Sequence, residues 1–501
     1  MSYYLGVDIG TFESKGVLVD PEGRIAGMAS RPHKMLVPRA GWAEHRPDED
    51  WWGDFVHITK ALLRETGINP KTIGAIGCSA IGPCMLPVDD DGNTLMNGVL
   101  YGVDNRAARE VAELTEKFGE ERLIAECGNA LTSQSVGPKI LWLKRNHPEI
   151  HAKAATIHTA TSYLVQKLTG ERVIDHYTAA NFAPLYRIAD RGWSSELSEG
   201  IVDPDRLPVP RWSTEITGAV TAVAAEETGL AAGTPVITGT VDAAAEAVSV
   251  GVAAPGQMMV MYGSTIFIIM PTAERVSDPR LWYAPWLFDG QHASMAGLAT
   301  SGTLTHWFRD QFARELDPDD AFPALAKEAE ASPPGAKGLV MLPYFSGERT
   351  PIHDPDAKGV IFGLDLTHTR GDIYRALLEG IAYGTTHVVD TYREIGHAPK
   401  TLHAVGGGTK NRVWAQATSD VTGMRQVLRE KSVGASYGDA FLAAVALGDA
   451  ELADIDRWNP EVEGFAPDPA NVNAYSRQYQ VFRDLYPGTK ALMAALSADA
   501  P

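Results

Sequence analysis

Residues 6–20, GVDIGTFESKGVLVD, place two apolar segments rich in β-branched residues on either side of an acid, a glycine and a threonine. This composition is typical of strands and the Gly10–Thr11 pair is typical of a turn, so the stretch predicts a β-hairpin. The backbone N–H groups and the Thr11 hydroxyl can converge where the first strand ends, and the glycine lets a ligand approach closely. Phosphate oxygens fit such a turn.

Asp8 lies just before this turn and Lys15 lies just after it. The acid would repel a phosphate unless a divalent cation lay between them, and Mg²⁺ is the usual bridge. Asp8 therefore predicts a metal if Gly10 and Thr11 predict a phosphate. Read alone, these residues fit a plain hairpin turn at least as well.

Length and composition set the class of protein. A chain of 501 residues is long enough for two packed domains, and 45% hydrophobic with 21% charged residues is typical of a globular protein. A net charge of -19 argues against binding to nucleic acids or acidic membranes, but not against a small anionic ligand. The sparse cysteines, Cys78, Cys84 and Cys127, predict reduced thiols, and the lack of a membrane-crossing stretch favours a cytoplasmic location.

Strand-like and helical segments alternate along the chain, which predicts an α/β fold. Residues 234–252 read as a strand, a glycine turn and an Ala-rich helix that begins at Asp242. A second apolar hairpin follows at 256–270, bent at Gly263-Ser264-Thr265, so each half contains a strand, a small-residue turn and a strand. We expect two domains, residues 1–247 and 248–501. A triple glycine at 406–408 precedes a helix that ends near Gly423.

Three small-residue turns in this order resemble the actin, Hsp70 and sugar kinase superfamily. More narrowly, the chain resembles the FGGY family of carbohydrate kinases from about residue 4 to about residue 450. The supporting stretches are GWAEHRPDEDWW at 41–52, the segment at 342–384 that ends in RALLEGIAYG, and GGGTKNRVWAQATSDVTG at 406–423. The resemblance implies two actin-like (ribonuclease H-like) lobes with a nucleotide and sugar cleft between them, and a hinge motion that closes it.

The resemblance also implies the roles of individual residues, with ATP and Mg²⁺ as cofactors and a small sugar or polyol as substrate. It gives Asp8 to Mg²⁺, Gly10, Thr11, Lys15, Gly263 and Ser264 to the phosphates, Gly407, Gly408 and Asn411 to the adenosine, and Asp242 to the catalytic base.

Asp242 begins a helix, where unpaired backbone N–H groups favour the charged carboxylate, so we expect it to be ionised at neutral pH. A weak base is adequate, because phosphoryl transfer depends more on positioning the hydroxyl than on basicity. An N-terminal cap is the alternative interpretation of the same residue, and both can hold at once.

The acceptor is less well defined. Xylulokinases carry a Gln-Met-His stretch where this chain has Ile81, Gly82 and Pro83, and often an asparagine where it has Ala243. A ketopentose such as xylulose or ribulose is the leading expectation, with another polyol, a tetritol or tetrulose, or an aldonic acid as alternatives. Candidate substrate contacts are Gly82, Pro83, Asp104, Gln134 and Asp242, with Arg106 beside them; Asp104, Arg106 and Gln134 could equally be surface or capping residues.

Two other classes of protein compete with the kinase. A non-catalytic actin-like nucleotide switch would keep the hairpins but would need no acid at Asp242. A nicotinamide-dependent dehydrogenase would need a different glycine spacing and an acid about twenty residues after residues 406–408. Oligomeric state is not readable from the pattern, and a homodimer is common for enzymes of this size.

Overall fold

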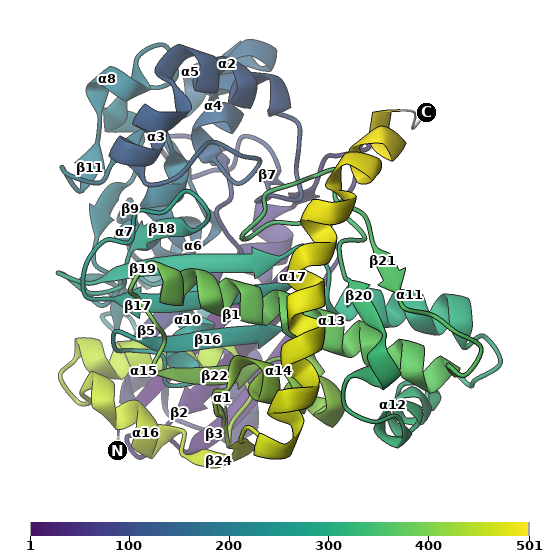
Figure 1. Ribbon diagram of the computed structural model, residues 1–501. Helices are drawn as coiled ribbons and strands as arrows, with labels where there is room; N and C mark the ends of the chain where they lie inside the picture. Colours follow the sequence, from purple (N-terminus) through teal and green to yellow (C-terminus); the bar gives the residue numbers. More distant parts are fainter. Residues whose placement is uncertain (1, 499–501) are drawn as a thin grey trace.

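Two sheets of seven strands form the centre of the computed structural model, which describes residues 2–498 (Figure 1). The first sheet contains β1 (Tyr3–Ile9), β2 (Glu13–Val19), β3 (Ile25–Pro32), β5 (Ile73–Ala80), β13 (Ile216–Ala219), β14 (Pro235–Ile237) and β15 (Thr240–Val241). The second contains β16 (Gln257–Tyr262), β17 (Ile266–Thr272), β18 (Trp282–Pro285), β19 (His292–Leu298), β22 (Thr401–Val405), β23 (Gln426–Arg429) and β24 (Glu461–Phe465).

The two sheets repeat one strand pattern. In the first, β3, β2 and β1 are antiparallel neighbours, and β5 and β14 then continue parallel to β1. In the second, β19, β17 and β16 are antiparallel neighbours, and β22 and β23 continue parallel to β16. Both hairpins expected from the sequence are confirmed, and so is the two-lobed α/β fold.

One helix from each half of the chain fills the space between the sheets. α10 (Asp242–Ser249) follows β15 of the first sheet, and α15 (Ala435–Ala446) follows β23 of the second. The two helices pack on each other, and α15 also packs on β1 and β5 of the first sheet. Their apolar side chains belong to one core with residues of both sheets, among them Val17, Ala247, Met259 and Phe441.

Two glycines make this packing possible. A Cβ on Gly77 of β5 would lie 2.3 Å from the Asp439 carbonyl oxygen, and a Cβ on Gly438 of α15 would lie 2.0 Å from the Ala245 carbonyl oxygen. Both neighbours are backbone atoms that cannot rotate away. Because glycine has no side chain, the backbones of β5 and α15, and those of α15 and α10, can approach this closely.

Other helices cover the outer faces of the sheets. α1 (Gly53–Thr66) packs on β2 and β3, and α6 (Ala160–Thr169) packs on β5. α13 (Arg370–Glu394) packs on α14 (Arg412–Thr422), and the long C-terminal helix α17 (Pro469–Ala498), yellow in Figure 1, lies across both. An insertion with α2 (Ala108–Phe118), α3 (Glu120–Cys127), α4 (Val136–Asn146) and α5 (Pro148–Lys153) gathers at one end of the molecule, where it is coloured blue.

The helices and strands mostly match their predicted positions. α14 ends at the left-handed Gly423, as its pattern predicts. α1 likewise ends at a left-handed glycine, Gly67. β20 is a short strand, Val340–Leu342. The C-terminal α17 is one long helix with Pro487 inside it. Within residues 2–498 no helix is both long and apolar enough to cross a membrane.

We predict that Gly438→Ala lowers the free energy of unfolding by about 1–3 kcal/mol, because the added methyl group overpacks the contact between α15 and α10. Urea unfolding followed by circular dichroism measures the change. Gly488→Ala is the matched control, since this exposed helical glycine has no atom within 4 Å of an added Cβ. It should instead raise the free energy of unfolding by about 1 kcal/mol. Equal effects of the two substitutions would contradict the packing argument.

Candidate active site between the two sheets

The first hairpin places a carboxylate and a lysine side by side. In the register of β1 and β2, Asp8 lies opposite Lys15. Asp8 is partly buried, and the Ser79 hydroxyl on β5 donates to its Oδ1 at 3.1 Å. Lys15 is 45% exposed at its side chain, and its Nζ lies 3.3 Å from Glu13 Oε2. Gly10 and Thr11 form the turn between the two strands.

Three further acids lie near Asp8. Burial raises the pKa of Asp8 well above its ordinary value, and the negative charges of Asp242 and Glu246 raise it further. The Ser79 Oγ also lies 2.7 Å from Asp439 Oδ2 of α15, and burial raises the pKa of that carboxyl as well. The end of β1, α10 and α15 therefore meet at a concentration of negative charge that a cation would relieve.

The second hairpin turn is fixed from behind by a helix. The Gly263 carbonyl accepts hydrogen bonds from the Gly302 N–H and the Ser301 hydroxyl, both at 3.0 Å. The Ser264 carbonyl accepts from the N–H groups of Ser301 and Thr303, both at 3.1 Å. These donors belong to the first turn of α11 (Gly302–Phe312) and the residue before it.

A cavity of about 720 Å³ opens from this second turn toward the triple glycine. Gly263 and Ser264 line one end, and Gly407, Gly408 and Asn411 line the other. Apolar side chains complete the wall, among them Phe322 and Ala326 of α12 (Ala321–Ala331), Tyr374 and Trp414. The Asn411 Oδ1 accepts from the Trp414 N–H at 3.2 Å and caps α14. The turn and the triple glycine, far apart in sequence, thus share one cavity.

A smaller cavity, about 110 Å³, lies between the lobes beside Asp242. Gly82, Pro83 and Gln134, three of the candidate substrate contacts named from the sequence, line it. Phe267 and Trp282 of the second sheet form another part of its wall, with ring centroids 6.4 Å apart. Asn129, Thr132, Tyr177, Asn181 and Met295 were not predicted and also line it. No local motif marks these residues, because the fold collects them from distant segments.

Asp242 differs from its predicted state in two ways. Val241 is the N-cap residue of α10, and Asp242 is the first residue of the helix. Burial raises the pKa of Asp242 to about 7, although the Ala243 N–H donates to its Oδ1 at 2.7 Å and opposes that rise. The carboxyl is therefore divided between its two forms at neutral pH rather than fully ionised. Desolvation outweighs the helix terminus here.

Asp104 is not part of either cavity. Its carboxylate is fully buried and accepts hydrogen bonds from the Arg106 guanidinium at 2.8–3.0 Å, from the Arg106 backbone N–H at 3.1 Å and from the Ala43 N–H at 2.7 Å. The same guanidinium pairs with Glu44 at 2.8 Å and lies 4.0 Å from the centroid of the Trp42 ring. Asp104 and Arg106 therefore join the insertion to the segment around Ala43, as parts of the core.

Comparison with known proteins agrees with the fold. A family model described as the FGGY family of carbohydrate kinases, N-terminal domain, matches residues 3–249, and the C-terminal domain model matches residues 258–447. The chain is 29% identical to a xylulose kinase of Bacillus subtilis, over 99% of both chains. It is 30% identical to a xylulose kinase of Escherichia coli, over 98% of this chain and all of the other.

A solved structure shows the same architecture. The crystal structure of a xylulose kinase from Rhodospirillum rubrum superimposes with a TM-score of 0.92 at 33% identity, over 98% of this chain and all of the other. The similarity therefore spans both lobes and the insertion.

We predict that Asp104→Ala lowers the free energy of unfolding by about 3–5 kcal/mol, because it leaves the buried Arg106 charge without its main partner. Urea unfolding measures this. Gln134→Ala, at a residue that lines the smaller cavity and is not fully buried, should be nearly neutral in the same experiment. A small effect of Asp104→Ala on stability, together with a large one on ligand binding, would instead favour the substrate contact expected from the sequence.

Proposed function

The chain belongs to the FGGY family of carbohydrate kinases, and from that premise we propose that it phosphorylates a hydroxyl of a small uncharged ketopentose such as xylulose. The carbohydrate kinase activity and its dependence on ATP follow from the family. The identity of the acceptor and the roles of single residues are the proposal. The observation that carries it is the placement of Asp242, which lines the small cavity and is close enough to Asp8 for its charge to raise the pKa of that acid.

The lining of the small cavity favours a neutral acceptor. Asp242 is the one charged residue among the side chains that line it within residues 2–498, and no lysine, arginine or histidine is among them. An aldonic acid would bring its carboxylate next to Asp242 without a compensating cation. Amide and hydroxyl groups of Gln134, Asn181 and Thr132 suit sugar hydroxyls instead. The relatives named as xylulose kinases support a ketopentose.

Asp242 supplies the base. In the ionised form its carboxylate accepts the proton of the attacking hydroxyl, and a pKa of about 7 makes it a better base than an exposed carboxylate. The same burial excludes water from the acceptor, so the hydroxyl of the sugar reacts in place of a water molecule. Phosphoryl transfer needs the hydroxyl held in line with the phosphate, and the walls of the small cavity hold it there.

The two turns and the larger cavity would take the nucleotide. Gly10, Thr11, Lys15, Gly263 and Ser264 would contact its phosphates, and Gly407, Gly408 and Asn411 would lie against its adenosine. The N–H groups of the two turns provide donors for phosphate oxygens without a bulky side chain in the way. Lys15 adds a positive charge that its salt bridge with Glu13 leaves partly exposed.

Asp8 would hold Mg²⁺. A hard cation with most of its waters retained needs only one or two carboxylates beside the substrate phosphates, and Asp8, with the negative charges of Asp242 and Glu246 near it, suits such a cation. When bound, the cation would neutralise charge on the phosphates. Asp8 and the Ser79 hydroxyl would fix its place in the first lobe.

Asp242→Asn is predicted to lower kcat by about 10²–10⁴-fold, because the amide cannot accept the proton of the hydroxyl. ADP release coupled to a colour reaction measures the rate. The Kd for ADP with Mg²⁺, measured by calorimetry, should not rise, since the substitution removes only a negative charge. Full activity in the variant would remove Asp242 from the mechanism.

We also predict that xylulose and ribulose give higher kcat/KM than glycerol, erythritol or gluconate in a panel at equal concentrations. Gluconate should be the poorest, because its carboxylate would face Asp242. Gluconate as the best acceptor would contradict the proposed class. If no compound is turned over while ADP still binds, the nucleotide-switch interpretation is favoured.

A further inference from the structure

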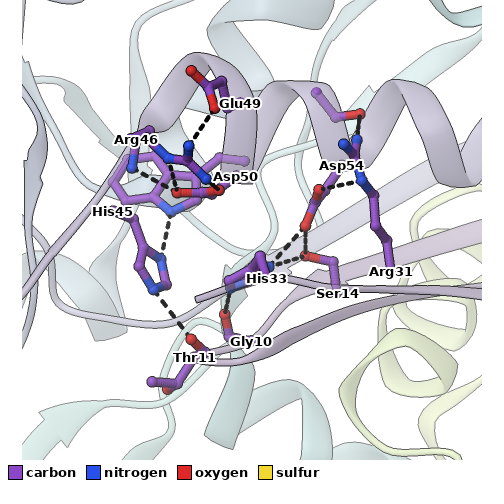
Figure 2. Close-up of polar contacts among 12 residues, drawn as sticks. Gly10, Thr11, Ser14, Arg31, His33, His45, Arg46, Glu49, Asp50 and Asp54 are labelled. Carbon is purple, nitrogen blue, oxygen red and sulfur yellow. Dashed lines mark hydrogen bonds and ion pairs between the residues drawn. The ribbon is translucent and has the colours of Figure 1, made fainter. Parts of the chain in front are cut away.

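Three consecutive carbonyl groups of the first hairpin turn are held by donors from outside the hairpin. The Gly10 carbonyl oxygen lies 3.0 Å from His33 Nε2, and the Thr11 carbonyl oxygen lies 3.1 Å from His45 Nε2 (Figure 2). The Phe12 carbonyl accepts from the His33 backbone N–H at 2.9 Å. A carbonyl oxygen can only accept, so each ring nitrogen is the donor.

These contacts set the direction of the N–H groups on the other side of the turn. A trans peptide is planar, and its carbonyl points opposite to the N–H of the next residue. With the carbonyls of Gly10 and Thr11 pointing at the histidines, the N–H groups of Thr11 and Phe12 point away from them. Neither N–H donates to any group within residues 2–498. They are free for an anion.

The tautomer of His45 is determined by its neighbours. The Trp51 indole N–H, which can only donate, donates to His45 Nδ1 at 3.1 Å. Burial, together with the nearby His33, lowers the pKa of His45 to about 4, so the ring is neutral at physiological pH. A neutral ring that accepts at Nδ1 carries its one proton on Nε2. That proton faces the Thr11 carbonyl.

His45 has little freedom to move. It is fully buried, and Trp51, also fully buried, packs edge-on against the Tyr163 ring with centroids 6.2 Å apart. His33 packs edge-on against His45 at 4.8 Å between centroids. Its Nδ1 faces Asp54 Oδ2 of α1 at 2.8 Å.

The Asp54 carboxylate links His33 to residues of β2 and β3. Its Oδ2 also accepts from the Ser14 hydroxyl at 2.7 Å, and its Oδ1 pairs with Arg31 at 3.3 Å. Figure 2 shows both histidines beneath the segment that leads into α1: His33 lies between Asp54 and Gly10, and His45 reaches Thr11.

In the second lobe, backbone N–H groups hold the carbonyls of the hairpin turn. There the carbonyls of Gly263 and Ser264 accept from N–H groups at the start of α11. Among the described residues no helix starts at the corresponding carbonyls of the first lobe. The side chains of His45, from the segment GWAEHRPDEDWW, and of His33, which follows β3, take that place. The first turn therefore depends on two imidazole rings.

We propose that His45, with His33 beside it, is a positioning residue: its Nε2–H holds the Thr11 carbonyl so that the N–H groups of Thr11 and Phe12 face the phosphates of the nucleotide. This inference rests on the proposed function, which supplies the phosphates. It deepens that function by assigning a role to residues that contact neither cavity. His45 does not contact the substrate and is not a catalytic residue.

A pair of variants separates positioning from simple packing. In His45→Asn the amide replaces Nδ1 and can still accept from Trp51, but it is too short to reach the Thr11 carbonyl. In His45→Gln the amide N–H₂ reaches the place of Nε2. His151→Asn is the matched control, because that buried ring also contacts a backbone carbonyl through Nε2, that of Ile201 at 3.2 Å, far from the turn.

The Kd for ADP with Mg²⁺, measured by calorimetry without sugar, is the main readout. His45→Asn should raise it about tenfold and lower kcat about a hundredfold, while the Kd for xylulose stays unchanged. His45→Gln should restore both values toward those of the wild type. His151→Asn should lower the melting temperature without changing either. If His45→Asn does not fold, His33→Asn and His33→Gln provide the same test at the Gly10 carbonyl.

The results distinguish a failure of the positioning role from a failure of the proposed function. Equal ADP binding by His45→Asn and the wild type overturns the positioning role, and so does an equal loss in the Asn and Gln variants. A wild-type protein that turns over no sugar overturns the proposed function. In that case weaker ADP binding by His45→Asn alone would still support positioning, because that measurement needs no acceptor.

Discussion

A peptide group that points its N–H at an anion must point its carbonyl the opposite way, and that carbonyl needs a donor. Both hairpin turns of this protein meet this constraint. In the second lobe the start of α11 provides the donors, and in the first lobe His33 and His45 provide them. The direction in which the N–H groups of each turn point thus depends on the donors that hold its carbonyls. Each turn is short, and donors from other elements fix the orientation of its peptide groups.

The second requirement is that the two lobes pack together, and the contact between α10 and α15 meets it. α10 starts from the first sheet and α15 from the second, and both lie in the space between the sheets. Their close contact brings Asp242 at the start of α10 near Asp8 at the end of β1. The same contact places Asp439 of α15 within 2.7 Å of Ser79. One packing arrangement therefore joins the lobes and assembles the acids of the site.

Much of this could be predicted where the signal is local. The hairpins, the helix that begins at Asp242 and the helix stop at Gly423 depend on alternation and turn chemistry over a few residues. The protonation of Asp242 could not be predicted, because burial by side chains from the other sheet decides it. Asp104 was expected near the sugar and is instead paired with Arg106 in the core, since a buried ion pair and a ligand contact have the same residue types. His33 and His45 carry no motif of their own.

The acids of the site argue that it was selected for ligand binding rather than for stability. The Ser79 hydroxyl has one proton and faces carboxylate oxygens of both Asp8 and Asp439, so it cannot satisfy both at once. Asp439 Oδ1 has no partner within residues 2–498, and burial raises the pKa of each acid. Such an arrangement costs folding free energy, and an apolar contact would cost none. A positive charge bound among these acids during the reaction would offset this cost.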